Sequence, residues 1–88
     1  MASVVIYGRA GCHLCDVAKA AIVELQQSLP FELTYVDIAS DPMLAADYGT
    51  LIPVIFVGNE EVARYRVDPV VLRDKILAQG ASQTGSGS

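Results

Sequence analysis

The apolar residues of the chain fall first into a short run and then into a helical stripe. Residues 4–7, Val-Val-Ile-Tyr, are apolar and mostly β-branched, which is typical of a central strand buried on both faces. From Cys12 to Leu29 the apolar side chains recur at intervals of three and four residues, with charged and amide side chains between them. This spacing predicts an amphipathic helix, which ends at Pro30 because proline cannot continue the helical hydrogen bonds.

The middle of the chain predicts a strand and a short helix. Residues 31–38 favour a second strand, but their alternation of apolar and polar side chains is imperfect, so the pattern leaves the buried face of this strand open. Ser40, Asp41 and Pro42 then supply capping groups and a proline, which favour the start of a helix. We expect that helix to continue to about Tyr48.

The last third of the chain predicts a hairpin and a final helix. Pro53 precedes a very apolar strand over residues 54–57, and turn residues separate it from a shorter strand over residues 61–65. These two strands are expected to pair antiparallel. Asp68-Pro69 repeats the helix opening, and the final helix is predicted to end near Gly80. The predicted order is βαβαββα, an α/β fold.

Composition sets the size and the class of the domain. The 88 residues are 52% hydrophobic and 18% charged, which suffices for one soluble globular domain and is too apolar for a disordered chain. The last nine residues are only Gly, Ser, Gln, Thr and one Ala, and they cannot bury enough apolar surface to offset their ordering entropy. We therefore expect one domain over residues 1–79 and a flexible Gly/Ser tail over residues 80–88.

Charge and hydropathy argue against several classes of partner. Ten acidic and six basic residues give a net charge of −4, which offers no attraction for nucleic acid or for an anionic membrane surface. No apolar run approaches the roughly 20 residues of a membrane span, and the N-terminus has no basic leader. We expect a cytoplasmic protein that is a monomer.

Cys12 and Cys15 are the only cysteines and lie three positions apart, where the first strand leads through a turn into a helix. Unpaired N–H groups and the helix macrodipole stabilise negative charge there, so Cys12 is expected to be the exposed, partly ionised thiol. Cys15 lies one turn deeper on nearly the same face and is expected to be shielded. The pair predicts dithiol chemistry, in which the Cys12 thiolate attacks a disulfide and Cys15 resolves the mixed disulfide.

Charged neighbours are expected to tune the acidity of the Cys12 thiol. His13 and Arg9 would each add positive charge near its sulfur and favour the thiolate. Asp16 would oppose the thiolate, although its charge suits the helix N-terminus. The balance depends on distances that the sequence does not give, so the redox potential stays open.

Other uses of the cysteine pair also stay open. Two cysteines and His13 fall short of the four ligands of a structural zinc site, and two buried thiols can be inert. A copper carrier is an alternative because soft thiolates bind Cu(I), and so is an iron–sulfur cluster shared by two chains. A binding module without redox activity is a further alternative, and no residue is assigned as a metal ligand.

The succession of a strand, a CxxC motif that opens a helix, a second strand, a helix, an X-Pro step before a hairpin and a final helix resembles the glutaredoxin branch of the thioredoxin fold. The likeness covers residues 4–79. Cys12-His13-Leu14-Cys15 and Ile52-Pro53-Val54 resemble a group of short glutaredoxin-like proteins with C-H-L-C in place of C-P-Y-C. The resemblance implies a three-layer fold with a mixed four-stranded sheet. It also implies thiol-disulfide oxidoreductase activity in electron transport, with the two cysteines as nucleophile and resolving thiol.

The resemblance implies roles for four further residues. Pro53 would be a cis proline that faces the redox-active disulfide. Ile52 would offer its backbone N–H and C=O groups to the cysteinyl segment of the substrate. Arg9 would meet a carboxylate of glutathione, and Asp68 would hold its γ-glutamyl end.

Departures from the family pattern leave the use of glutathione open. Glutaredoxins usually carry two glycines shortly before that aspartate, whereas this chain has Tyr65 and Arg66, which would crowd a close backbone approach. Leu51 replaces a threonine that is common in the family. The expected substrates are protein disulfides or glutathione adducts, with glutathione as a candidate co-substrate. No bound cofactor is expected, and the reductant that resets the pair is unidentified.

Overall fold

The computed structural model describes residues 2–86, and the side chains of residues 2–79. The predicted order of elements, βαβαββα, is confirmed, with one short 3-10 helix added after the second strand. The elements are β1 (Ser3–Gly8), α1 (His13–Ser28), β2 (Glu32–Asp37), the 3-10 helix η1 (Ile38–Ser40), α2 (Pro42–Tyr48), β3 (Val54–Val57), β4 (Glu60–Arg64) and α3 (Pro69–Ser86).

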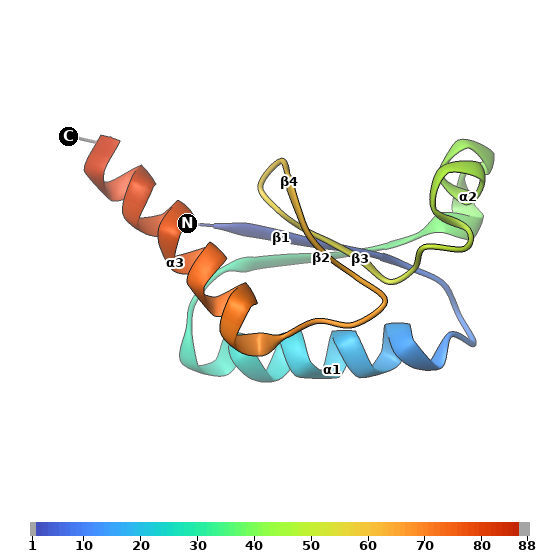
Figure 1. Ribbon diagram of the computed structural model, residues 1–88, viewed down its shortest axis with the longest axis horizontal. Helices are drawn as coiled ribbons and strands as arrows, with labels where there is room; N and C mark the ends of the chain where they lie inside the picture. Colours follow the sequence, from blue (N-terminus) through green and yellow to red (C-terminus); the bar gives the residue numbers. More distant parts are fainter. Residues whose placement is uncertain (1, 87–88) are drawn as a thin grey trace.

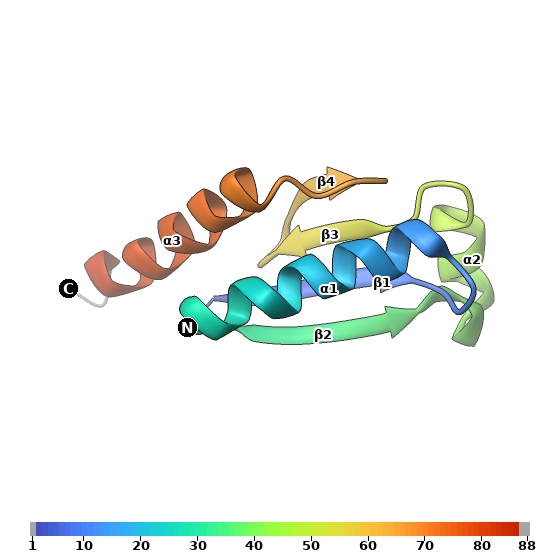
Figure 2. The same cartoon turned by 90° about the horizontal axis from the view of Figure 1, so that it is seen from below.

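The four strands form one mixed sheet in the order β2-β1-β3-β4, which Figure 2 shows from the side that α1 covers. β1 pairs parallel with β2 and antiparallel with β3, and β3 and β4 form the predicted antiparallel hairpin. β1 is therefore central, as its apolar run predicts. The residues that follow its last residue, Gly8, emerge at the end of the sheet where β3 begins, because Tyr7 pairs with Val54.

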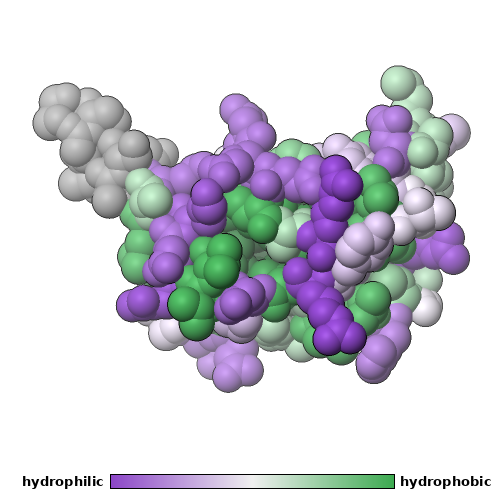
Figure 3. Space-filling model, viewed as in Figure 1, coloured by the Kyte–Doolittle hydropathy of each residue, from purple (hydrophilic) through white to green (hydrophobic). Residues whose placement is uncertain are grey.

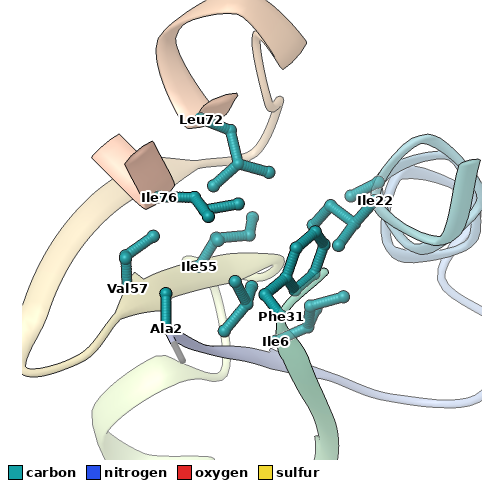
Figure 4. Close-up of a cluster of buried hydrophobic side chains, with 10 residues drawn as sticks. Ala2, Ile6, Ile22, Phe31, Ile55, Val57, Leu72 and Ile76 are labelled. Atoms are coloured by element: carbon teal, nitrogen blue, oxygen red, sulfur yellow. The ribbon is translucent and has the colours of Figure 1, made fainter. Parts of the chain in front are cut away.

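The main core lies between the sheet and the two longer helices, α1 and α3 (Figures 1 and 2). Val4 and Ile6 of β1 are fully buried, and Figure 4 shows Ile22 of α1 and Ile76 of α3 pointing into the same cluster. This burial explains the helical stripe of the sequence, since the apolar face of α1 packs on the sheet. The cluster consists of Ala2, Val4, Ile6, Ala18, Ile22, Phe31, Ile55, Val57, Leu72 and Ile76.

The face of β2 that the sequence leaves open is determined by its pairing with β1. Leu33 and Tyr35 lie beside Val4 and Ile6 in the parallel register, and neighbouring residues in register point to the same face of a sheet. Both side chains are partly buried and pack against the main cluster. β2 thus covers the core with one face only, as an edge strand.

α2 lies beyond the C-terminal ends of β1 and β2, and it extends to the side of the sheet opposite α1 (Figure 1). Asp41 caps this helix, with its Oδ1 accepting from the N–H of Met43 at 2.9 Å, and Pro42 is the first helical residue, as predicted. Tyr48 stacks on Tyr7 of β1 with ring centroids 5.0 Å apart. This contact joins α2 to the second face of the sheet and completes the third layer.

The final helix is longer than its sequence predicts. α3 continues through Ser86, so the helix end predicted near Gly80 is wrong. Elongation adds one backbone hydrogen bond for each residue fixed, which lets a nucleated helix extend into polar sequence. The flexibility predicted for residues 80–88 stays a prediction, and residues 87 and 88 lie outside the described part of the chain. Among residues 2–86, no helix has both the length and the apolar composition needed to cross a membrane.

Candidate functional site

The chain turns from β1 into α1 through residues 9–12, and this turn places the first cysteine at the helix start. Gly11 has a φ of 80°, a left-handed conformation that glycine adopts without steric cost. The backbone N–H of Cys12 donates to the carbonyl of Arg9 at 3.4 Å. Cys12 itself is extended, with φ −90° and ψ 111°, and occupies the N-cap position of α1.

The sulfur of Cys12 is the capping group of the helix. Its Sγ accepts a hydrogen bond from the backbone N–H of Cys15 at 3.2 Å. Capping positions usually carry a hydroxyl or carboxylate oxygen, which satisfies N–H groups that have no partner in the helix. Here a partly exposed thiol takes that place, at the N-terminal end of the helix.

Cys15 lies beneath this cap and is closed off from water. Its side chain is fully buried, and both cysteines are free thiols in the structure. Burial is the largest cause that raises the pKa of Cys15 to about 11, and the hydrogen bond with Cys12 raises it further. The predicted difference in exposure between the two thiols is therefore confirmed.

Tyr35 is a neighbour of the buried thiol that the sequence analysis does not identify. A Cβ atom on Gly8 would lie 2.5 Å from Tyr35 Oη and 3.0 Å from Cys15 Sγ. The phenol and the thiol therefore both occupy the space that a side chain on Gly8 would need. Burial raises the pKa of Tyr35, and the charge of Cys15 adds to the increase. Lys19 lies over the ring, with its Nζ 5.0 Å from the centroid. The parallel pairing of Tyr35 with Ile6 brings it to this place, and the sequence alone carries no signal for that pairing.

The proline loop lies at the same end of the sheet as the cysteines. The Ile52-Pro53 peptide bond is cis, as the resemblance implies, and Pro53 is buried immediately before β3. The carbonyl of Pro53 accepts from the N–H of Tyr65 at 2.8 Å. Ile52 is half-buried and lies outside the β3 ladder, which begins at Val54.

The charged residues predicted for the site divide into two groups. Arg9, His13 and Asp16 are exposed and lie within or beside the turn that carries Cys12. Asp68 instead begins α3, where its Oδ1 accepts from the N–H of Val70 at 2.9 Å. The structure therefore brings the first three residues together around the motif and gives Asp68 a capping role.

Comparison with known proteins places this geometry in a family. Residues 3–77 match the glutaredoxin-like domain family (DUF836). The protein Rv0508 of Mycobacterium tuberculosis is 30% identical over 73 residues, which cover 77% of this chain and 75% of that protein. The solution structure of protein Ne2328 from Nitrosomonas europaea has a TM-score of 0.73 and 34% identity, and the match covers 85% of this chain and 91% of that one.

A more distant structure shows the fold alone. Mitochondrial thioredoxin 3 of Saccharomyces cerevisiae, in its oxidized form, has a TM-score of 0.67 at 18% identity, covering 88% of this chain and 77% of that one. The predicted fold class is therefore confirmed. The chain belongs to the glutaredoxin-like domain family and has a thioredoxin fold.

Proposed function

We propose that the protein is a small dithiol-disulfide oxidoreductase that acts on protein disulfides or glutathione adducts. The observation that carries the proposal is the arrangement of the two sulfurs, in which Cys12 caps α1 within reach of solvent and Cys15 is fully buried beside it. This arrangement separates a thiol that a substrate can reach from one that only an adduct on Cys12 can meet. Cytoplasmic location is part of the proposal.

The reaction has two exchange steps. The Cys12 thiolate attacks one sulfur of the substrate disulfide, a Cys12–substrate disulfide forms, and the other substrate sulfur leaves as a thiolate and takes up a proton. Cys15 then loses its proton and attacks the Cys12 sulfur, which releases the second substrate thiol and leaves a Cys12–Cys15 disulfide. Two electrons pass to the substrate, and a thiol reductant returns them to the pair.

The surrounding residues position the substrate in this proposal. Ile52 pairs its backbone with the cysteinyl segment beside Pro53, and Arg9 attracts a carboxylate of the substrate. His13 and Asp16 are both exposed near the N-terminus of α1. In this proposal they act on the Cys12 sulfur in opposite directions, because a positive imidazole favours the thiolate and a carboxylate opposes it. Asp68 already caps α3, so its carboxylate would have to bind a glutathione adduct and accept from the helix N–H group at the same time.

A trapping experiment tests the proposal. The Cys15→Ser variant lacks the resolving thiol, so it should accumulate mixed disulfides on Cys12 when it is incubated with oxidised glutathione or a cell extract, and mass spectrometry identifies the adducts. The matched Cys12→Ser variant should form none, because its remaining thiol is buried.

Two results would contradict the proposal. An absence of adducts on folded Cys15→Ser protein would show that Cys12 does not exchange with disulfides. A stoichiometric metal ion or iron–sulfur cluster in the purified protein, bound through the cysteines, would instead favour the carrier alternative.

A further inference from the structure

A groove of about 430 Å³ begins at the cysteine motif and runs between α1 and the loop that joins β4 to α3. Figure 1 shows this loop passing along α1 before α3 begins. Its walls include Leu14, Val17 and Ala21 from the helix and Tyr65, Arg66 and Val67 from the loop. His13 and Leu14, the two residues between the cysteines, both line it, so the groove borders the cysteine motif. The volume falls within the usual range of roughly 300–1,000 Å³ for ligand pockets.

The groove leaves large apolar side chains in contact with water. Leu14 is 37% exposed, Val17 53% and Tyr65 46%, and Figure 3 shows hydrophobic residues exposed among hydrophilic ones on this face of the molecule. Clustered apolar surface is a mark of an interaction site, whereas single exposed residues are not. Glutathione has no apolar side chain to cover these residues. A bulky apolar side chain next to a substrate cysteine would cover them.

Arg66 is the positively charged residue that lines the groove. His13 and Arg66 are its ionisable lining residues besides Tyr65, and no carboxylate is among them, although the whole chain has a net charge of −4. Within the described part of the chain, Arg64 pairs with Glu61 while Arg66 is in no ion pair. The guanidinium of Arg66 is therefore available to a carboxylate on the occupant.

Two backbone hydrogen bonds fix the turn that carries Tyr65, a lining residue of the groove. Tyr65 has a φ of 65°, a conformation that is costly for a bulky residue and free for glycine. Its N–H donates to Pro53 at 2.8 Å, and the next N–H, of Arg66, donates back to Arg64 at 2.6 Å. These bonds fix the turn beside the proline loop while the tyrosine ring stays half exposed. Such outliers persist where the surroundings determine them and often belong to functional sites.

We propose that this groove selects, as the substrate of Cys12, a disulfide-bearing protein segment with a bulky apolar side chain and a carboxylate next to its cysteine, in preference to glutathione disulfide. The inference rests on the proposed oxidoreductase function and names its substrate class. The lining by His13 and Leu14 places the groove beside the reactive thiol, and the apolar walls with the Arg66 guanidinium indicate the chemistry of the segment.

The test compares three disulfides on the Cys15→Ser protein, in which Cys12 reacts once. One peptide carries Leu and Glu beside a cysteine, a matched peptide carries Ser and Gln there, and glutathione is the third. All three are activated as disulfides with the same coloured thiol, whose release gives the rate. We expect the Leu-Glu peptide to react roughly tenfold faster than the Ser-Gln peptide, which corresponds to one well-buried side chain.

Substitutions of groove residues test whether the preference for the Leu-Glu peptide comes from the groove. Tyr65→Gly removes the wall at a backbone position that glycine adopts freely, so it should fold and lose most of the preference. Val17→Ser should reduce the preference without touching the loop. Val70→Ser replaces an equally small side chain that is 67% exposed outside the groove, and it should leave the preference unchanged.

The outcomes separate the two proposals. Equal rates for the two peptides, faster reaction with glutathione, or an unchanged preference in folded Tyr65→Gly and Val17→Ser would overturn the groove assignment while Cys12 exchange stands. Failure of all three disulfides to react would overturn the oxidoreductase proposal itself, and the groove assignment with it.

Discussion

The residues around the two sulfurs change the acidity of Cys15 during the proposed reaction. Burial accounts for the largest part of its raised pKa, and the neighbouring Cys12 sulfur contributes through a hydrogen bond and through its charge. In a mixed disulfide the Cys12 sulfur is uncharged and is a poor acceptor for the Cys15 S–H, so both Cys12 contributions disappear. Cys15 therefore ionises more easily at the step in which it attacks.

Gly8 is the residue whose replacement should disturb this site most directly. A methyl group there would press on Tyr35 Oη and Cys15 Sγ, at 2.5 and 3.0 Å. We expect Gly8→Ala to lower the free energy of unfolding by about 1–3 kcal/mol, the usual cost of overpacking. Urea denaturation measures this loss, and the lifetime of the Cys12 mixed disulfide should increase because Cys15 is displaced.

The hydroxyl of Tyr35 provides the matched control for that substitution. In a Tyr35→Phe background the closest contact of the new methyl group is gone, so Gly8→Ala should cost less than it does in the wild type. An equal cost in both backgrounds would show that the phenol and Gly8 are not coupled, since independent substitutions add.

The residues of the motif could be predicted from the sequence, and the residues that surround it in space could not. The strand-to-helix turn indicates Cys12 as the exposed thiol and Cys15 as the shielded one, and the structure has Cys15 buried and Cys12 partly exposed. Tyr35 comes from another strand, and only the register of β1 with β2 brings it to the buried thiol. The left-handed backbone of Tyr65 is hidden for the same reason, because the hydrogen bond to Pro53 that accompanies it is tertiary.

At the scale of elements, each of the three described α-helices begins with a side chain that accepts a backbone N–H, and of these α1 alone uses sulfur. For α3 the cap is Asp68, which the family resemblance also assigns to glutathione. We expect Asp68→Ala to lower the free energy of unfolding by about 0.5–2 kcal/mol and Asp68→Asn to cost far less, because asparagine caps equally well. Chemical denaturation of both variants checks this order.

The same pair of variants separates capping from substrate binding. Asp68→Asn keeps the cap and removes the charge, so a slower reaction with oxidised glutathione in this variant would assign the carboxylate to the substrate. Similar stability losses in both variants would contradict the capping role.

Element boundaries follow from sequence where a local signal stops the element. Pro30 ends α1 and Pro42 begins α2 as predicted, because proline acts through its own ring and missing donor. The end of α3 lacks such a stop, and Gly80 alone does not interrupt the helix. The buried face of β2 depends on its pairing with β1, which a single imperfect alternation does not encode.

At the scale of the whole molecule, the stability should depend on alkaline pH through Cys15. The pKa of this thiol is raised from 9.0 to about 11, so the folded state keeps its proton where the unfolded chain loses it. The stabilisation is fully present below pH 9 and is lost as the pH rises towards about 11. We expect the free energy of unfolding, measured in urea, to fall across this interval.

The Cys15→Ala variant is the control for this pH dependence. Its free energy of unfolding is lower at neutral pH because a buried group is lost, but it should fall less steeply above pH 9. Tyr35 is kept in both proteins, but the Cys15 charge contributes to its raised pKa, so the difference between the slopes measures Cys15 together with its effect on Tyr35. Equal slopes would contradict the assignment.

The cysteine motif contributes no residue to the main buried cluster. Val4 and Ile6 belong to the cluster, whereas Cys15 is buried outside it, and the two residues between the cysteines are exposed. Exchanges at exposed positions usually change stability by less than about 0.5 kcal/mol. Evolution, or a protein engineer, can therefore change substrate choice at these exposed positions of the motif with little loss of stability.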